Sequence, residues 1–130
     1  MRDLKQALLL LDLAREDLQV LGVMQDPRSV PERVFGFHAQ QAVEKAAKAW
    51  LALLGVEYPL THSLDELFDL IENRANASLA RFRYLEILTP FAVVLRYALP
   101  RLPAEELDRS ELTRRVSEFL DHVTALEADS

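Results

Sequence analysis

Hydrophobic residues recur at every third or fourth position along most of the chain, which is the period of an amphipathic helix. The pattern predicts five helical segments, over residues 4–24, 30–54, 64–73, 78–98 and 109–126. The fourth is expected to break at Thr89-Pro90 and to continue as a short new helix over residues 90–98, because threonine is a good cap and proline suits a first turn. The second segment is rich in alanine and apolar over much of its circumference, so we expect it to be the central helix.

Short polar residues stand at the predicted start of four segments, each followed three positions later by Glu or Gln, as in a capping box. The four pairs are Asp3 with Gln6, Ser29 with Glu32, Ser63 with Glu66, and Asp108 with Glu111. Asp26-Pro27 and Gly55 are expected to end the first and second segments. Period and caps together predict an all-α fold, an antiparallel up-and-down bundle of about five helices that forms a single domain over residues 1–130.

Composition narrows the classes of function. The chain has only 3 glycines, which disfavours a sandwich or barrel rich in turns, and it has no cysteine, which excludes disulfides, Cys-ligated zinc and a thiol nucleophile. A formal net charge of −6 excludes a uniformly basic coat for nucleic acid. The early apolar run over residues 7–11 is too short for a signal peptide or a membrane span, so we expect a cytoplasmic protein without membrane association.

Basic residues are concentrated in one stretch. Residues 74–101 carry five arginines and a single acid, so this stretch has a charge of +4 while the rest of the chain carries −10. Clustered arginines suit phosphate, because the planar guanidinium binds two oxygens at once. The alternative is that these arginines pair with the acidic faces of neighbouring helices.

The second segment carries a polar row made of His38, Gln41, Lys45 and Lys48, beside a second row in which Glu44 and Lys48 can pair at i,i+4. The alternative to a binding surface is a solvated face stabilised by that pair. The third histidine, His122, is expected to lie on the open surface of the last segment. No two histidines are three to five positions apart, so we expect neither a metal site nor a cofactor.

Three stretches together resemble one family. Residues 37–49 read FHAQQAVEKAAKA, residues 59–64 read PLTHSL, and residues 88–97 read LTPFAVVLRY. They resemble, in order and spacing, the signature helix, the proline-threonine-histidine turn and the arginine-tyrosine motif of HEPN domains (higher eukaryotes and prokaryotes nucleotide-binding). With the flanking helices, the resemblance covers about residues 4–125.

The resemblance implies a helical bundle that forms a homodimer and works beside nucleotides or RNA. Many HEPN proteins are encoded next to a minimal nucleotidyltransferase, with which they form a toxin–antitoxin pair. Others are metal-independent ribonucleases, in which an arginine is followed four to six residues later by a histidine. The arginine holds the phosphate and the histidine moves protons near neutral pH.

The chain departs from the ribonuclease pattern after Arg96, because Arg101, Leu102 and Pro103 occupy the positions expected for the histidine. We therefore favour a protein without catalytic activity that binds a nucleotide, RNA or a nucleotidyltransferase partner. The predicted binding residues are Arg96, Tyr97, Arg101, His62, Lys45 and Gln41. Two alternatives stay open: an endoribonuclease in which His62 or His38 replaces the missing histidine, and a dimerising interaction module without catalysis.

Overall fold

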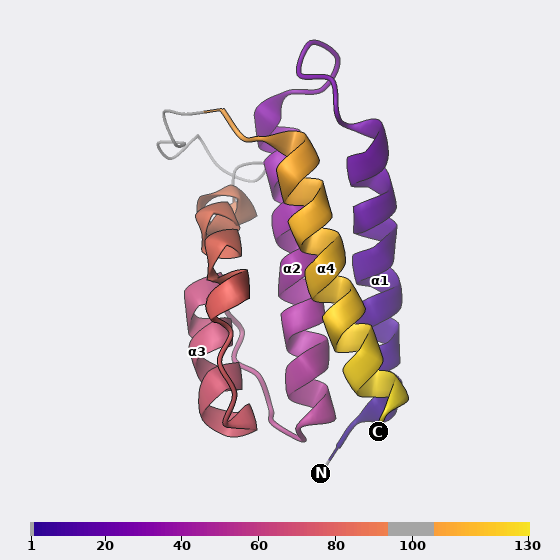
Figure 1. The fold of residues 1–130 in the computed structure, drawn as a ribbon, viewed down its shortest axis with the longest axis vertical. Helices are drawn as coiled ribbons and strands as arrows, with labels where there is room; N and C mark the ends of the chain where they lie inside the picture. Colours follow the sequence, from indigo (N-terminus) through magenta and orange to yellow (C-terminus); the bar gives the residue numbers. More distant parts are fainter. Residues whose placement is uncertain (1, 94–105) are drawn as a thin grey trace.

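The computed structural model describes residues 2–93 and 106–130. Its elements are α1 (Leu4–Val23), α2 (Glu32–Leu53), α3 (Leu64–Ala75), the 3₁₀ helix η1 (Ala80–Val93) and α4 (Arg109–Ala128). Within these described ranges there is no strand, which confirms the predicted all-α bundle (Figure 1). None of the described helices is long and apolar enough to cross a membrane.

Helix α2 is the central helix, as predicted, and it packs against each of the other four elements. Its alanines Ala39, Ala42, Ala46 and Ala49 are all fully buried, so neighbouring helices approach its backbone closely. Helices α1 and α4 cover one part of α2, and α3 with η1 covers the other (Figure 1).

The connection between α2 and α3 interrupts the simple alternation of helix directions. The loop that follows Leu53 returns along α2 until the backbone oxygen of His62 accepts a hydrogen bond from Gln40. Leu53 lies thirteen positions after Gln40 on this helix, a rise of about 20 Å. Helix α3 therefore starts part-way along α2 and runs in the same direction, while η1 returns antiparallel to it (Figure 1). This path carries His62 to the middle of the bundle.

Three of the predicted helix caps are confirmed. The side chains of Asp3, Ser63 and Asp108 each accept a hydrogen bond from the backbone N–H three residues later. The cap predicted at Ser29 is wrong, because α2 begins after Pro31 and has no side-chain cap. The carboxylate of Glu32 instead accepts a hydrogen bond from the backbone N–H of Leu107, which precedes α4. Glu32 therefore bonds to a residue distant in sequence instead of forming the predicted capping box with Ser29.

The predicted break at Thr89-Pro90 is also wrong within the described residues, because η1 continues through Pro90 to Val93. The Thr89 hydroxyl accepts a hydrogen bond from the backbone N–H of Leu64 and so caps the neighbouring element. The remainder of the short helix predicted over residues 90–98 lies outside the described residues. Five large apolar residues of this segment are spaced by three, which is the period of a 3₁₀ helix. All five side chains are buried: Leu79, Phe82, Leu85, Leu88 and Phe91.

Candidate functional site

A buried carboxylate on α1 joins two basic side chains of α2. Asp17 accepts a hydrogen bond from Lys45 Nζ at 2.7 Å and lies 3.1 Å from Nδ1 of His38. The Asp17 side chain is only 12% exposed, so its charge is held by these two partners rather than by water. The charge of Lys45 is therefore already matched within the bundle.

A second buried carboxylate, Glu44, organises the neighbouring part of α2. Its Oε1 lies 2.8 Å from the amide nitrogen of Gln40 and 2.9 Å from Nδ1 of His62, and its Oε2 lies 3.0 Å from Lys48 Nζ. Burial raises the pKa of Glu44, but the hydrogen bonds from these three partners outweigh burial and hold the pKa below its ordinary value. The carboxylate is therefore ionised at neutral pH.

The predicted pair of Glu44 with Lys48 is present, but the solvated face that would surround it is not. Gln40 is fully buried and Glu44 is 6% exposed. Gln41 donates from its amide to the side-chain oxygen of Gln40 at 2.8 Å. The polar row on α2 is thus a network packed between α1 and the loop before α3, because tertiary neighbours cover a side that the helix period alone leaves open.

His62 has the more accessible imidazole of the two that contact carboxylates. Its side chain is 48% exposed, against 29% for His38. A carboxylate that accepts from Nδ1–H leaves Nε2 as the proton acceptor, the arrangement that orients a general base. Of the predicted site residues, Gln41 is linked to His62 through Gln40, whereas Lys45 contacts Asp17 of α1.

Sequence reasoning missed Asp17, which anchors one end of this network. Its position carried a signal, since it follows the buried residues Ala7, Leu11 and Ala14 at helical spacing. An acidic residue on the buried stripe of a helix requires a buried partner. Three further predicted site residues, Arg96, Tyr97 and Arg101, lie outside the described residues.

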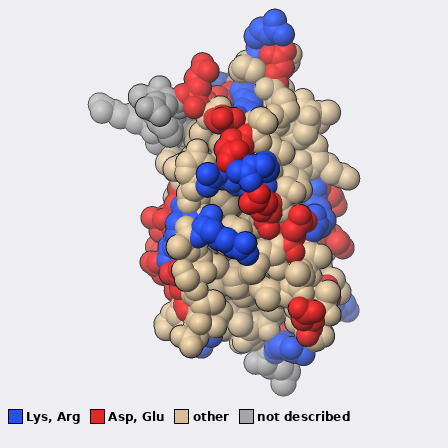
Figure 2. Space-filling view, viewed as in Figure 1, with Lys and Arg blue, Asp and Glu red and all other residues tan. Residues whose placement is uncertain are grey.

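The arginine-rich stretch is partly neutralised. Arg83 bonds to Asp69 at 2.7 Å, to Glu72 at 2.5 Å and to Glu86 at 2.6 Å. Although burial lowers the pKa of Arg83, the three carboxylates raise it above its ordinary value, so this arginine is committed to the junction of α3 and η1. On the face that Figure 2 shows, Lys and Arg alternate with Asp and Glu, which excludes a broad basic surface on that face.

The expectation that His122 lies on the open surface is wrong. Its ring centroid is 5.1 Å from that of Trp50 and 5.4 Å from that of Phe82, and its Nδ1 accepts a hydrogen bond from Arg81 at 2.8 Å. Burial, followed by the Arg81 charge, lowers the pKa of His122 below 6.5. Aromatic residues from α2 and η1 partly cover a position that is predicted to be exposed on its own helix.

We predict a pH-dependent loss of stability from His122. Because its pKa is lower in the folded than in the unfolded protein, its contribution is complete above about pH 6.5 and is lost as the pH falls below that value. Urea unfolding at pH 7.5 and pH 5.5 should show a larger decrease for the native protein than for His122→Asn, which keeps a hydrogen-bond acceptor but does not titrate. Equal decreases in the two proteins would contradict this assignment.

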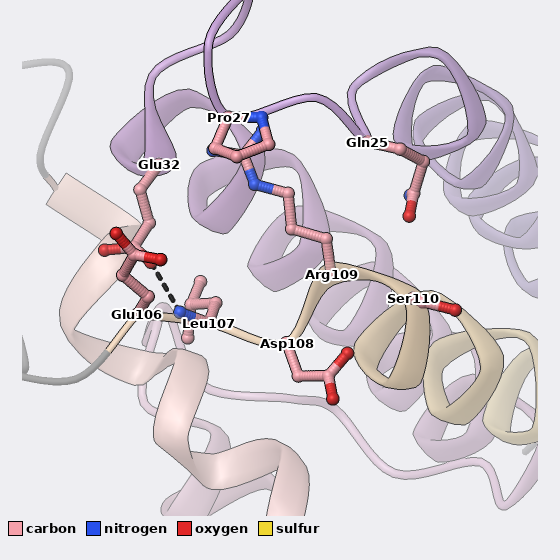
Figure 3. Close-up of a pocket in the computed structure, with 8 residues that line it drawn as sticks. All are labelled: Gln25, Pro27, Glu32, Glu106, Leu107, Asp108, Arg109 and Ser110. Carbon is pink, nitrogen blue, oxygen red and sulfur yellow. Dashed lines mark hydrogen bonds between the residues drawn. The ribbon is translucent and has the colours of Figure 1, made fainter.

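A pocket of about 400 Å³ lies where the chain enters α4 (Figure 3). It is lined by Gln25, Pro27, Glu32, Glu106, Leu107, Asp108, Arg109 and Ser110. The Arg109 guanidinium extends toward the loop that carries Pro27 and bonds to the backbone oxygens of Met24 and Val30. Among the described lining residues, the one guanidinium is bonded in this way and three side chains are carboxylates, so this part of the pocket is unsuited to phosphate.

Comparison with known proteins gives one family. A family model described as HEPN domain matches residues 4–126, nearly the whole chain. A comparison with curated proteins returns no match. The match spans both carboxylate networks on α2 as well as the stretch that contains Arg96 and Tyr97.

Proposed function

Because the chain belongs to the HEPN domain family, we propose that it binds the phosphate groups of a nucleotide or an RNA through Arg96 and Tyr97. The family match over residues 4–126, which spans both residues, is the observation that carries this proposal. A guanidinium binds two phosphate oxygens at once, and a neighbouring aromatic ring can stack on a base. Arg101 adds a second positive charge five residues after Arg96.

The ion pairs of other basic side chains support the choice of Arg96 as the phosphate-binding residue. Lys45, Lys48 and Arg83 each lie within 3.0 Å of a carboxylate oxygen of the same bundle. A phosphate that bound to any of them would have to displace that carboxylate. We therefore assign Lys45 a smaller part, and we propose that Gln41 and His62 contribute hydrogen bonds.

We further propose that the chain acts as one domain over residues 1–130, as a homodimer in the cytoplasm, with a minimal nucleotidyltransferase as partner in a toxin–antitoxin pair. In this proposal it is not a nuclease. General acid–base catalysis by a positioned side chain contributes roughly 10²–10⁴-fold, and the histidine expected after Arg96 is absent from the sequence.

Substitution of Arg96 by alanine is expected to weaken binding of labelled single-stranded RNA or of a nucleoside triphosphate by about 10- to 100-fold, the value of a charge-assisted hydrogen bond to phosphate. The matched control is Arg74→Ala, which removes the same charge from an exposed position at the end of α3. The melting temperature should stay near that of the native protein in both variants. Equal affinity of Arg96→Ala and Arg74→Ala for both ligands would refute the proposed site.

One observation favours a second candidate function, a metal-independent endoribonuclease. His62 lies 2.9 Å from the buried carboxylate of Glu44 and its side chain is 48% exposed. In this candidate, Glu44 accepts a hydrogen bond from Nδ1–H of His62, and Nε2 accepts the proton of a ribose 2′-hydroxyl. The resulting 2′-oxygen attacks the adjacent phosphate, the P–O5′ bond breaks to leave a 2′,3′-cyclic phosphate, and the leaving 5′-oxygen takes a proton from solvent, to which the imidazolium returns its own.

Incubation with single-stranded RNA in EDTA separates the two functions. We expect no cleavage by the native protein. Cleavage that is lost in His62→Ala and in Arg96→Ala, but kept in His38→Ala, would establish the second candidate and identify the base. His38 is the matched control because it also contacts a buried carboxylate, Asp17, but is less exposed.

A further inference from the structure

The outer side of α1 is unusually apolar. Among the described residues, five of the seven large hydrophobic side chains that are exposed belong to this helix, and none belongs to α2, α3 or α4. The five are Leu4, Leu8, Leu9, Leu13 and Val23. Their exposed fractions range from 36% for Leu13 to 81% for Val23. Figure 1 shows α1 at the edge of the bundle, with its outer side uncovered by any described element.

Helix α4 provides an internal comparison, since it also has 20 residues and also packs against α2. Its outer side carries a chain of ion pairs in which Arg114 bonds to Glu111 and Glu118, and Arg115 bonds to Glu111. It exposes no large hydrophobic residue. A surface helix of this bundle can therefore be fully polar on its outer side, so the exposed leucines of α1 need another explanation.

The charges on the outer side of α1 are ordered along the helix. Arg2 and Lys5 come before the leucines at 8 and 9, and Asp12 and Glu16 follow them. All four charged residues are exposed, and none of them forms an ion pair with another described residue. By contrast, Arg15 at the inner margin of the helix pairs with Asp121 of α4.

We infer that two copies of the chain join through α1, side by side and antiparallel, with the two-fold axis between Leu8 and Leu9. This inference deepens the proposed homodimer and rests on it. A two-fold axis brings together residues that are equally far from it on the two copies. Lys5 and Asp12 are both 3.5 positions from this midpoint, so each Lys5 meets the partner's Asp12.

The apolar residues fit the same register. Leu8 and Leu9 lie within about 1 Å of the midpoint along the helix axis, so each meets its own copy across the two-fold. Lys5 and Asp12 lie about 5 Å from the midpoint, close enough to remain in contact at the usual helix crossing angles. Arg2 and Glu16 come together further out. A parallel arrangement would place Lys5 against Lys5 and Asp12 against Asp12, which like-charge repulsion disfavours.

Charge exchange tests this arrangement. Sedimentation velocity over a range of concentrations should show that Lys5→Glu and Asp12→Lys each raise the dimer dissociation constant by about tenfold, since each creates two like-charge contacts across the two-fold. The double variant Lys5→Glu/Asp12→Lys restores opposite charges and should return the constant to near the native value. Arg114→Glu on α4 is the control for a change of net charge and should leave it unchanged.

Cross-linking gives an independent readout, because the chain has no cysteine of its own. A mixture of the Lys5→Cys and Asp12→Cys variants should cross-link efficiently with a short thiol-specific reagent, whereas either variant alone should not. If the protein dimerises but the charge exchanges do not change its dissociation constant and the predicted cross-link does not form, the dimer does not use the α1 surface. That result would refute this inference but not the proposed homodimer. A native protein that stays monomeric at every concentration would overturn both.

Discussion

Substitution of Gly36 by alanine is expected to destabilise the protein by about 1–3 kcal/mol, the usual cost of overpacking a core. A Cβ atom at Gly36 would lie 2.2 Å from Cδ1 of Phe91 and 2.6 Å from two further atoms of that ring. Phe91 is fully buried on η1, so its ring has no open space to enter. This cost exceeds the roughly 0.5–1 kcal/mol by which alanine is the better helix former.

The chain offers a matched control in Gly22, near the end of α1. A Cβ atom there would meet nothing within 4 Å, so Gly22→Ala should stabilise the protein by roughly 0.5–1 kcal/mol. Urea unfolding of both variants should therefore show opposite signs. Combining Gly36→Ala with Phe91→Leu should recover part of the loss, because leucine lacks the ring. A stabilising effect of Gly36→Ala would mean that η1 does not pack against α2 at this point.

Substitution of Arg109 by alanine should cost about 3–5 kcal/mol, the second large effect. The residue is 7% exposed, and its guanidinium donates to the backbone oxygens of Met24 at 2.7 Å and Val30 at 2.8 Å. Truncation would leave two carbonyl groups without their donor, each at about 1–3 kcal/mol, and would remove the packing of the guanidinium against Phe35. The side chain ties the end of α1, the following loop and the start of α4 together (Figure 3).

Two variants control for this result. Arg109→Lys keeps the charge but can reach only one carbonyl at a time, so it should retain an intermediate stability. Arg114→Ala removes an arginine from the exposed side of the same helix, where ion pairs contribute at most about 1 kcal/mol. Unfolding in guanidinium chloride measures the free energy of unfolding of Arg109→Ala, Arg109→Lys and Arg114→Ala. If Arg109→Ala were no more destabilising than Arg114→Ala, the buried hydrogen bonds would have no energetic role.

Contacts that are short in sequence account for the features that could be predicted. The caps at Asp3, Ser63 and Asp108 each join a side chain to a backbone N–H three residues later, and Glu44 with Lys48 spans one helical turn. Such contacts need no partner from a distant part of the chain. The cap at Ser29 failed because Glu32 bonds to a residue 75 positions away.

The sequence of η1 contains a signal for a 3₁₀ helix, although its caps and prolines predict an interrupted α-helix. The large buried side chains from Leu79 to Phe91 follow one another at a constant spacing of three. In an α-helix, residues three apart drift around the axis, whereas in a 3₁₀ helix they are eclipsed and form one straight stripe. A strict period of three over five positions therefore separates the two.

Hydrophobic period and capping are local properties, and they predicted the all-α bundle, its central helix and the start of most helices. Three sequence motifs, not the period, indicated the HEPN family. Which polar groups are buried depends instead on contacts between helices that are distant in sequence. Asp17 meets Lys45 across 28 positions, and His62 meets Glu44 only because the loop before α3 climbs back along α2. The helical period predicts the direction in which a side chain points from the axis of its own helix. Whether that side chain is buried depends on the other elements that pack against it. For that reason the polar row on α2, expected as an open surface, is a network of internally matched charges.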